Sequence, residues 1–120
     1  MARIRTIKPS MFSSLTVAAW PFEVRWLFAG LFTYLDDYGY GIDEPRLVKA
    51  EVFPLDDKIT ANKVDGFLSR ISESGPLCRY EVDGRNYMHV VTWKEHQRVS
   101  HPTDSSVPWC PAHTFERNES

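Results

Sequence analysis

Apolar side chains recur at helical spacing through the first long segment of the chain. These positions are Val24, Leu27, Phe28, Leu31, Phe32 and Leu35. They follow the i, i+3, i+4, i+7 rule of an amphipathic helix, and Pro21 suits the first turn of such a helix. Glycines 39 and 41 supply the backbone freedom for a sharp reversal. The pattern predicts a helix over residues 21–37.

Two further helices are predicted downstream. The run Asp43-Glu44-Pro45 has a capping acid and a first-turn proline, and Pro54 ends that helix at the residue before it, which gives residues 44–53. Thr60 is the next candidate cap, and apolar residues then repeat every three or four positions until Gly75-Pro76. This second pattern predicts a helix over residues 60–74.

Beyond Pro76 the apolar period changes from helical spacing to alternation. Two alternating runs flank Asp83-Gly84, a dipeptide typical of a tight β-hairpin. Three helices followed by a hairpin give an α+β fold with the chain order of a winged helix-turn-helix, in which the hairpin is a two-stranded wing. The predicted organisation is a basic N-terminal arm (residues 1–20), a winged-helix domain (21–93), and a post-wing extension with an extended or disordered tail (94–120).

Composition and charge narrow the classes of protein that fit this pattern. The chain has 120 residues, of which 42% are hydrophobic and 25% charged, with a net charge of −2. Two cysteines cannot make a disulfide scaffold, and the longest apolar-rich stretch is too short to cross a membrane, so we expect no membrane association and a cytoplasmic location. Residues 1–20 carry three bases and no acid, whereas residues 21–57 carry three bases and eight acids. Basic ends around an acidic middle allow a one-sided nucleic-acid surface.

The third predicted helix is the candidate reader of DNA bases. With its apolar face packed inward, its outer face carries Asn62, Lys63, Ser69 and Arg70, together with Asp65 and Gly66. Asn62 can hydrogen-bond a base edge, while Lys63 and Arg70 can reach phosphate or guanine. The alternative is that this helix only fills the core and shows water a mixed polar face.

Three other segments carry candidate phosphate contacts. They are the arm (Arg3, Arg5, Lys8), the wing (Arg79, Arg85, Asn86) and the post-wing segment (Lys94, Arg98). Basic arms of DNA-binding domains reach into minor grooves or along phosphates. A solvated terminus, and hairpin charges that only keep the sheet edge soluble, are the alternatives.

The sequence predicts neither an enzyme nor a bound cofactor or metal. Capping and turn roles account for the acids of residues 36–44, which lack the register of a calcium loop. Cys110-Pro-Ala-His113 has zinc-like spacing, but one loose pair in a proline-rich tail is weak, and Cys78 is interpreted as a small buried residue. The chain has no nucleophile elbow, phosphate-binding loop or zinc-protease motif, and nothing assembles a nucleophile with a base.

Several motifs together resemble a family of phage and prophage winged-helix proteins, the replication initiators or replisome organisers. The segments that carry the resemblance are Ala2-Arg-Ile-Arg-Thr-Ile-Lys-Pro, Leu27-Phe-Ala-Gly-Leu-Phe-Thr-Tyr-Leu-Asp-Asp-Tyr-Gly39, residues 45–54, Arg79-Tyr-Glu-Val-Asp-Gly-Arg and Trp93-Lys-Glu-His-Gln-Arg. The resemblance spans roughly residues 2–108. It implies double-stranded DNA binding near an origin in the bacterial host cytoplasm, with recruitment of host or phage replication proteins.

Two functions are therefore consistent with the sequence. The first is a DNA-binding winged helix of a phage or prophage, acting in replication initiation or regulation. The second is a winged helix that binds a host or replisome protein without touching DNA, through its acidic or aromatic surface. A homodimer is a further expectation, since winged helices often self-associate. The aromatic residues proposed for its face are Trp20, Tyr38, Tyr40 and Trp109.

Overall fold

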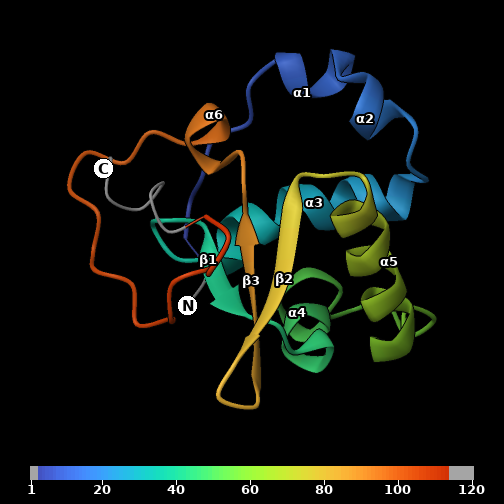
Figure 1. The fold of residues 1–120 in the computed structure, drawn as a ribbon. Coiled ribbons are helices and arrows are strands. Elements are labelled where there is room, and N and C mark those ends of the chain that lie inside the picture. The colour runs from blue at the N-terminus through green and yellow to red at the C-terminus, as the bar shows by residue number, and fades with distance from the viewer. Residues whose placement is uncertain (1–2, 114–120) are drawn as a thin grey trace.

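The structure is a computed structural model that describes residues 3–113. It is an α+β fold in which helices cover one face of a small antiparallel sheet (Figure 1). Its elements are α1 (Ser10–Ser13), α2 (Leu15–Ala18), α3 (Phe22–Tyr34), β1 (Tyr40–Ile42), α4 (Pro45–Val52), α5 (Ala61–Glu73), β2 (Leu77–Val82), β3 (Arg85–Val90) and α6 (Trp93–His96).

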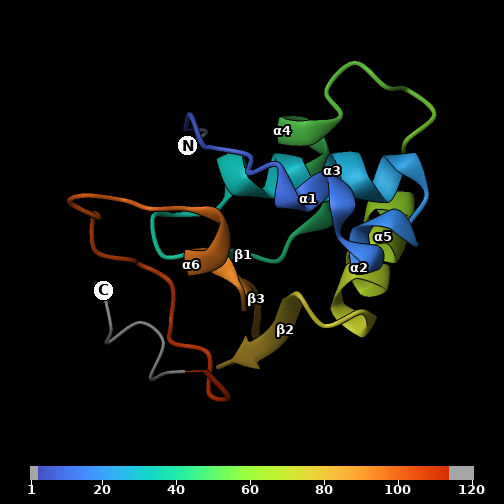
Figure 2. The same cartoon turned by 90° about the horizontal axis from the view of Figure 1, so that it is seen from above.

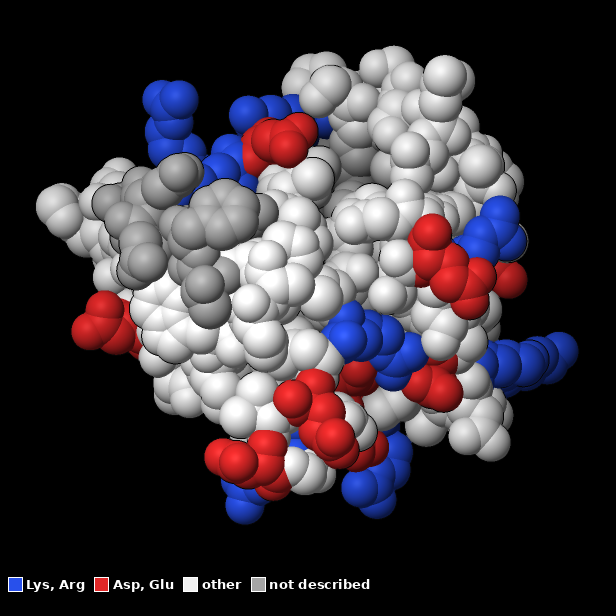
Figure 3. All heavy atoms as spheres, viewed as in Figure 1, with Lys and Arg blue, Asp and Glu red and all other residues white. Residues whose placement is uncertain are grey.

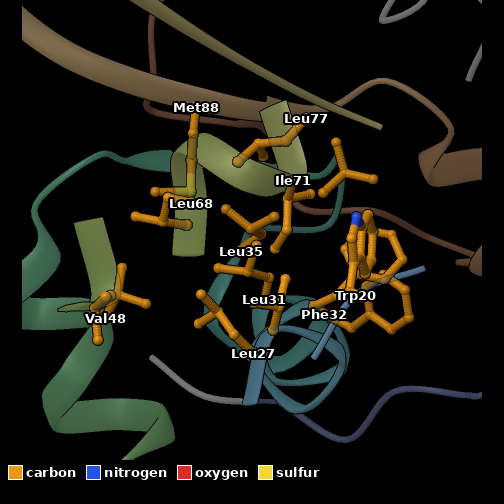
Figure 4. Close-up of a cluster of buried hydrophobic side chains, with 14 of the residues drawn as sticks. Trp20, Leu27, Leu31, Phe32, Leu35, Val48, Leu68, Ile71, Leu77 and Met88 are labelled. Carbon is orange, nitrogen blue, oxygen red and sulfur yellow. The ribbon is translucent and has the colours of Figure 1, made fainter. Parts of the chain in front are cut away.

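Helix α3 forms the centre of the core. Its apolar stripe, Val24, Leu27, Phe28, Leu31 and Phe32, is buried against α4 and α5. Figure 4 shows side chains of α3 meeting those of α5 and of the strands in one cluster. Helices α1 and α2 lie across α3 (Figure 2), and Met11 of α1 joins the same cluster.

The three long helices and the hairpin confirm the elements that were predicted from the periodicity of the sequence. Each helix is within three residues of its predicted bounds at either end. The Thr60 hydroxyl accepts from the backbone N–H of Lys63, as expected of a cap. The hairpin turns at Asp83 and Gly84, with φ of 53° and 80°, which is the left-handed pair that a two-residue turn needs.

The sheet has three strands, whereas the sequence predicted two. The extra strand, β1, pairs antiparallel with β3, and the order across the sheet is β1-β3-β2. The sequence suggested only a reversal here, because a three-residue strand beside two glycines has too few positions to show alternation. The Asp36 carboxylate accepts from the N–H groups of Tyr38 and Tyr40, which turns the chain from α3 into β1.

The two ends of the chain make more contacts than their sequences predicted. In the arm, the N–H of Arg3 donates to the carbonyl of Thr33, and Thr6 exchanges hydrogen bonds with the buried side chain of Gln97. After α6, the chain crosses the sheet face that points away from α5. The hydroxyl of Tyr80 donates there to the carbonyl of Pro108, and Cys110 is fully buried.

These contacts hold residues 97–113, which form neither helix nor strand, against the folded part of the chain. Single side chains anchor this segment at separate points, and such anchors leave no apolar period in the sequence. Tyr40 is buried in the sheet, where it stacks on His89, and Trp20 is buried beside Phe28 of α3. Neither ring is available for the homodimer face for which both were proposed.

Candidate nucleic-acid interface

Helix α5 presents a polar outer face opposite its buried stripe. Val64, Leu68 and Ile71 are buried. On the opposite side the exposed residues are Asn62, Lys63, Asp65, Gly66 and Arg70. Because the stripe fixes the rotation of the helix, the polar positions point outward together.

Gly66 lies in the middle of this outer face. A Cβ built at Gly66 would meet no atom within 4 Å, so the backbone there is open to solvent. Glycine at an open helical position lowers stability by about 0.5–1 kcal/mol relative to alanine. The packing of this chain therefore does not require the glycine, and its bare backbone permits close approach of another molecule.

The hairpin extends beside α5 and carries exposed polar side chains near its turn. Arg85 and Asn86 are both exposed, and the carbonyl of Asn86 accepts from the N–H of Asp43. The first turn of α5 and the hairpin turn both lie at the lower end of the molecule in Figure 1. The exposed side chains near these two turns are Asn62 and Lys63 on α5 and Arg85 and Asn86 on the hairpin, and we call these four residues the helix–hairpin surface.

Arg79, on strand β2 of the hairpin, points toward α5, and its guanidinium is hydrogen-bonded by other side chains of the protein. Its Nε donates to Asp43 Oδ2 (2.6 Å), its Nη2 to Asp65 Oδ1 (2.6 Å) and its Nη1 to Ser69 Oγ (3.0 Å). The hydrogen bonds to Asp43 raise the pKa of Arg79, against the opposing effect of burial. Arg79 and Ser69 were predicted to contact DNA. In the structure these groups instead fix the hairpin against α5.

The predicted basic arm is also turned toward the protein. Arg3 Nη1 donates to both carboxylate oxygens of Asp37 (2.9 Å each), and Arg5 Nη2 donates to Asp37 Oδ1 (3.0 Å). Arg5 further donates to the carbonyls of Phe32 (2.9 Å) and Leu35 (3.2 Å) at the end of α3. Only 7% of its side chain is exposed. Arg5 therefore caps α3 and has little surface left for a phosphate.

Asp37 is the group around which the arm is ordered. Burial raises the pKa of Asp37, but the Thr103 N–H, the Arg5 guanidinium and the charge of Arg3 outweigh burial and hold this pKa below its usual value. The backbone carbonyl of Asp37 also accepts from the indole N–H of Trp93 (2.9 Å). The sequence indicated only a turn role for Asp37, because its arginine partners lie more than 30 residues away along the chain.

The remaining predicted residues do not join the helix–hairpin surface. Lys94 and Arg98 are exposed at and after α6, at the opposite end of β3 from the hairpin turn. A six-residue strand separates those ends by roughly 20 Å. Lys8 is exposed just before α1, and Arg70 donates to the carbonyl of Ala19 (3.2 Å), at the side of α5 that faces α2.

The charge on the visible face is mixed. Figure 3 shows Lys and Arg side chains interspersed with Asp and Glu over α5 and the hairpin, with no continuous basic patch. Steering by net charge is therefore weak on this face, and local contacts have to provide any affinity for phosphate.

Among residues 3–113, one cluster brings together side chains able to hold a metal ion. Ligand atoms of Cys78, Cys110 and His113 lie within 4.8 Å of one another. The sequence showed the Cys110–His113 spacing but gave no sign that Cys78, on β2, lies beside it.

No protein-family model, curated protein or solved structure matches the chain. No helix within the described range is both long enough and apolar enough to cross a membrane.

Proposed function

We propose that the chain is a winged helix-turn-helix protein that binds double-stranded DNA through the helix–hairpin surface. The observation that supports this proposal best is that the outer face of α5 is polar and exposed to solvent, with the hairpin packed beside it. The order α3, β1, α4, α5, β2, β3, with the sheet order β1-β3-β2, supports this assignment. In a winged helix, the third helix of the domain enters the major groove and the hairpin follows the backbone.

The exposed residues suit distinct parts of a duplex. The amide of Asn62 can pair with an adenine edge, and Lys63 can neutralise a phosphate. Gly66 lets the backbone of α5 approach the groove without a side chain in between. Arg85 and Asn86 near the hairpin turn can contact the adjacent backbone or minor groove.

Arg79 gives this surface a fixed shape. Because it joins β2 to Asp65 and Ser69 of α5, it sets the distance between the reading helix and the hairpin. Asp65 is then neutralised on the face that would meet DNA. We therefore assign Arg79 a positioning role, in place of the phosphate contact expected from sequence.

A salt series tests the proposal. Each phosphate contact releases counterions, so log affinity should fall linearly with log salt. Lys63→Ala or Arg85→Ala should weaken binding to all sequences and lower the slope by about 1. The matched control is Lys94→Ala, at an exposed lysine beyond the far end of β3, which should leave the affinity and the salt slope unchanged. A folded chain that binds no duplex at low salt would contradict the proposal.

The biological setting we propose is replication initiation or its regulation in a phage or prophage, in the bacterial cytoplasm. It rests on the motif resemblance to replisome organisers. If it holds, the preferred site lies in DNA near the origin of the same phage. Footprinting across that locus, compared with unrelated DNA of equal length and base composition, measures the preference. Equal affinity for both would leave a DNA-binding protein with no origin role.

An exposed apolar groove favours the second candidate function, protein interaction without DNA contact. Phe12, Phe22, Trp26 and Leu55 line this groove, and all four are between 65% and 91% exposed. Apolar surface of this kind is typical of a binding site for another protein. This alternative predicts no duplex binding at 50 mM salt and capture of a replication protein of the phage or host that Trp26→Ser abolishes. Loss of DNA binding in Lys63→Ala with no effect of Trp26→Ser favours the first function.

A further inference from the structure

The face of the sheet turned away from α5 carries a cluster of thiol and imidazole groups. Arg79 points toward α5, so the alternation of a strand directs Cys78 to the opposite face. The segment after α6 crosses that face and brings Cys110 and His113 onto Cys78. The cluster therefore joins Cys78 to residues that lie 32 or more positions further along the chain.

The distances within the cluster suit a tetrahedral metal site. Cys78 Sγ lies 3.6 Å from Cys110 Sγ, and Cys110 Sγ lies 3.2 Å from His113 Nδ1. Zinc bonds of about 2.3 Å to sulfur and about 2.0 Å to nitrogen place two tetrahedral sulfurs about 3.8 Å apart and sulfur and nitrogen about 3.5 Å apart. Both observed distances are within a few tenths of an ångström of these values.

A disulfide does not describe this arrangement. Its sulfurs would have to lie about 2.05 Å apart, whereas the sulfurs of Cys78 and Cys110 lie 3.6 Å apart. Two thiolates and one imidazole are a soft donor set, which favours Zn²⁺ over Mg²⁺ or Ca²⁺. Cys110 is fully buried and the other two side chains are half-buried, so the site is closed on most sides.

The surroundings also suit a metal that anchors the segment after α6. Between residues 98 and 113, Cys110 is the one side chain that is buried. The ring of His89 lies beside the site, 5.6 Å from that of His113. His89 pairs with Cys78 across the strands and stacks on Tyr40 at 4.0 Å. A metal here would tie residues 110–113 to the rigid middle of the sheet.

We propose that Cys78, Cys110 and His113 bind one Zn²⁺ ion, which fastens the C-terminal segment to the sheet. The three side chains occupy three tetrahedral positions, and the fourth is open to water or a further ligand. The prediction of no metal from sequence is thereby replaced. That prediction depended on a single Cys–His pair, and the fold supplies the third donor from β2. Zinc binding here is independent of whether the helix–hairpin surface binds DNA.

Metal content of the purified full-length chain tests the site. The chain is kept reduced with a phosphine, loaded with Zn²⁺ and dialysed, and the metal is then measured by mass spectrometry. We expect one zinc per chain, lost in each of Cys78→Ser, Cys110→Ser and His113→Ala. The matched control is His101→Ala, a histidine of the same segment that is exposed and outside the cluster, and it should keep the metal.

Cobalt replacement and proteolysis keep the test valid if one variant folds poorly. Co²⁺ alone should give thiolate charge-transfer and tetrahedral d–d absorption in the parent chain. Zinc should slow cleavage between residues 98 and 109, and a chelator should reverse that protection while leaving helix content unchanged. A folded, reduced chain that takes up no stoichiometric metal would overturn the proposal. So would metal that stays bound in Cys78→Ser, or a Cys78–Cys110 disulfide formed in zinc buffer without bound metal.

Discussion

The basic residues of the N-terminal arm and those near the hairpin turn differ in how far the protein itself uses their hydrogen-bond donors. In the arm, the Arg5 side chain is 7% exposed and its donors are used by Asp37 and by two carbonyls at the end of α3. On the hairpin, Arg85 is exposed, and within residues 3–113 it takes part in none of the ion pairs. The sequence suggested phosphate contact for both.

The difference shows what decides the role of an arginine. A guanidinium is available to a ligand only where the fold leaves its donors without internal acceptors. The end of α3 offers unpaired carbonyls and a buried carboxylate, which together attract the arm. The carboxylate of the hairpin turn, Asp83, is exposed to solvent. Basic character therefore identifies candidates for DNA contact, and internal acceptors remove some of them.

The largest expected effect comes from removing the acceptor of the arm. Asp37→Ala leaves the buried Arg5 without its carboxylate, and breaking a buried ion pair from one side costs about 3–5 kcal/mol. Urea denaturation should show a loss of this size in the free energy of unfolding. The matched control is Asp57→Ala, an exposed acid, with an expected change under about 0.5 kcal/mol. Equal small losses in both would show that the arm is not anchored by Asp37.

Replacing each of these two arginines by alanine separates their roles directly. Arg5→Ala should lower the free energy of unfolding by about 2–3 kcal/mol, because hydrogen bonds to a charged group are lost. Arg85→Ala should change it by less than about 0.5 kcal/mol. In DNA binding the order reverses: Arg85→Ala lowers the salt slope and Arg5→Ala, measured on folded protein, does not. A slope lowered by Arg5→Ala would show that the arm leaves Asp37 to bind DNA.

Acid should weaken the core around the arm in two separate pH ranges. Burial lowers the pKa of His96 below 6.5, and Lys8 adds to this effect while Glu95 opposes it, so the folded state favours neutral imidazole and stability falls as pH drops below about 6.5. The pKa of Asp37 is held below 3.8, so its contribution is complete above that value and is lost at lower pH. When the free energy of unfolding is measured against pH, the decrease below about pH 6.5 should be absent in His96→Gln. The decrease at lower pH, where Asp37 is protonated, should be absent in Asp37→Asn. One unbroken slope in all three proteins would contradict both assignments.

The smallest expected effect is at Gly66, and its sign is the test. Gly66→Ala should stabilise the chain by about 0.5–1 kcal/mol, because the added methyl meets no atom within 4 Å. Where α5 approaches a groove closely, the same methyl should weaken DNA binding. Thermal melting and a DNA-binding titration on the same preparation compare the change in stability with the change in affinity. Increased stability with unchanged affinity would show that DNA does not approach α5 at Gly66.

Local sequence patterns determined the types of most elements. Residues three and four positions apart share a helix face, so the stripe from Val24 to Leu35 specified α3 without reference to the rest of the chain. Asp83-Gly84 specified the hairpin turn in the same way, because its left-handed backbone is a property of two adjacent residues. The exposed side of α5, with Asn62 and Lys63, followed from its buried stripe.

Tertiary structure decided which of the candidate residues remain free and which are used internally. Arg79 meets Asp43 across 36 positions of sequence, Arg5 meets Asp37 across 32, and Cys78 meets Cys110 across 32. Strand β1 likewise depends on β3, nearly 50 residues away. Periodicity records how a segment faces the core, since that choice repeats every few residues. A single polar pair leaves no repeat in the sequence, so its partner is set only when packing brings distant segments together.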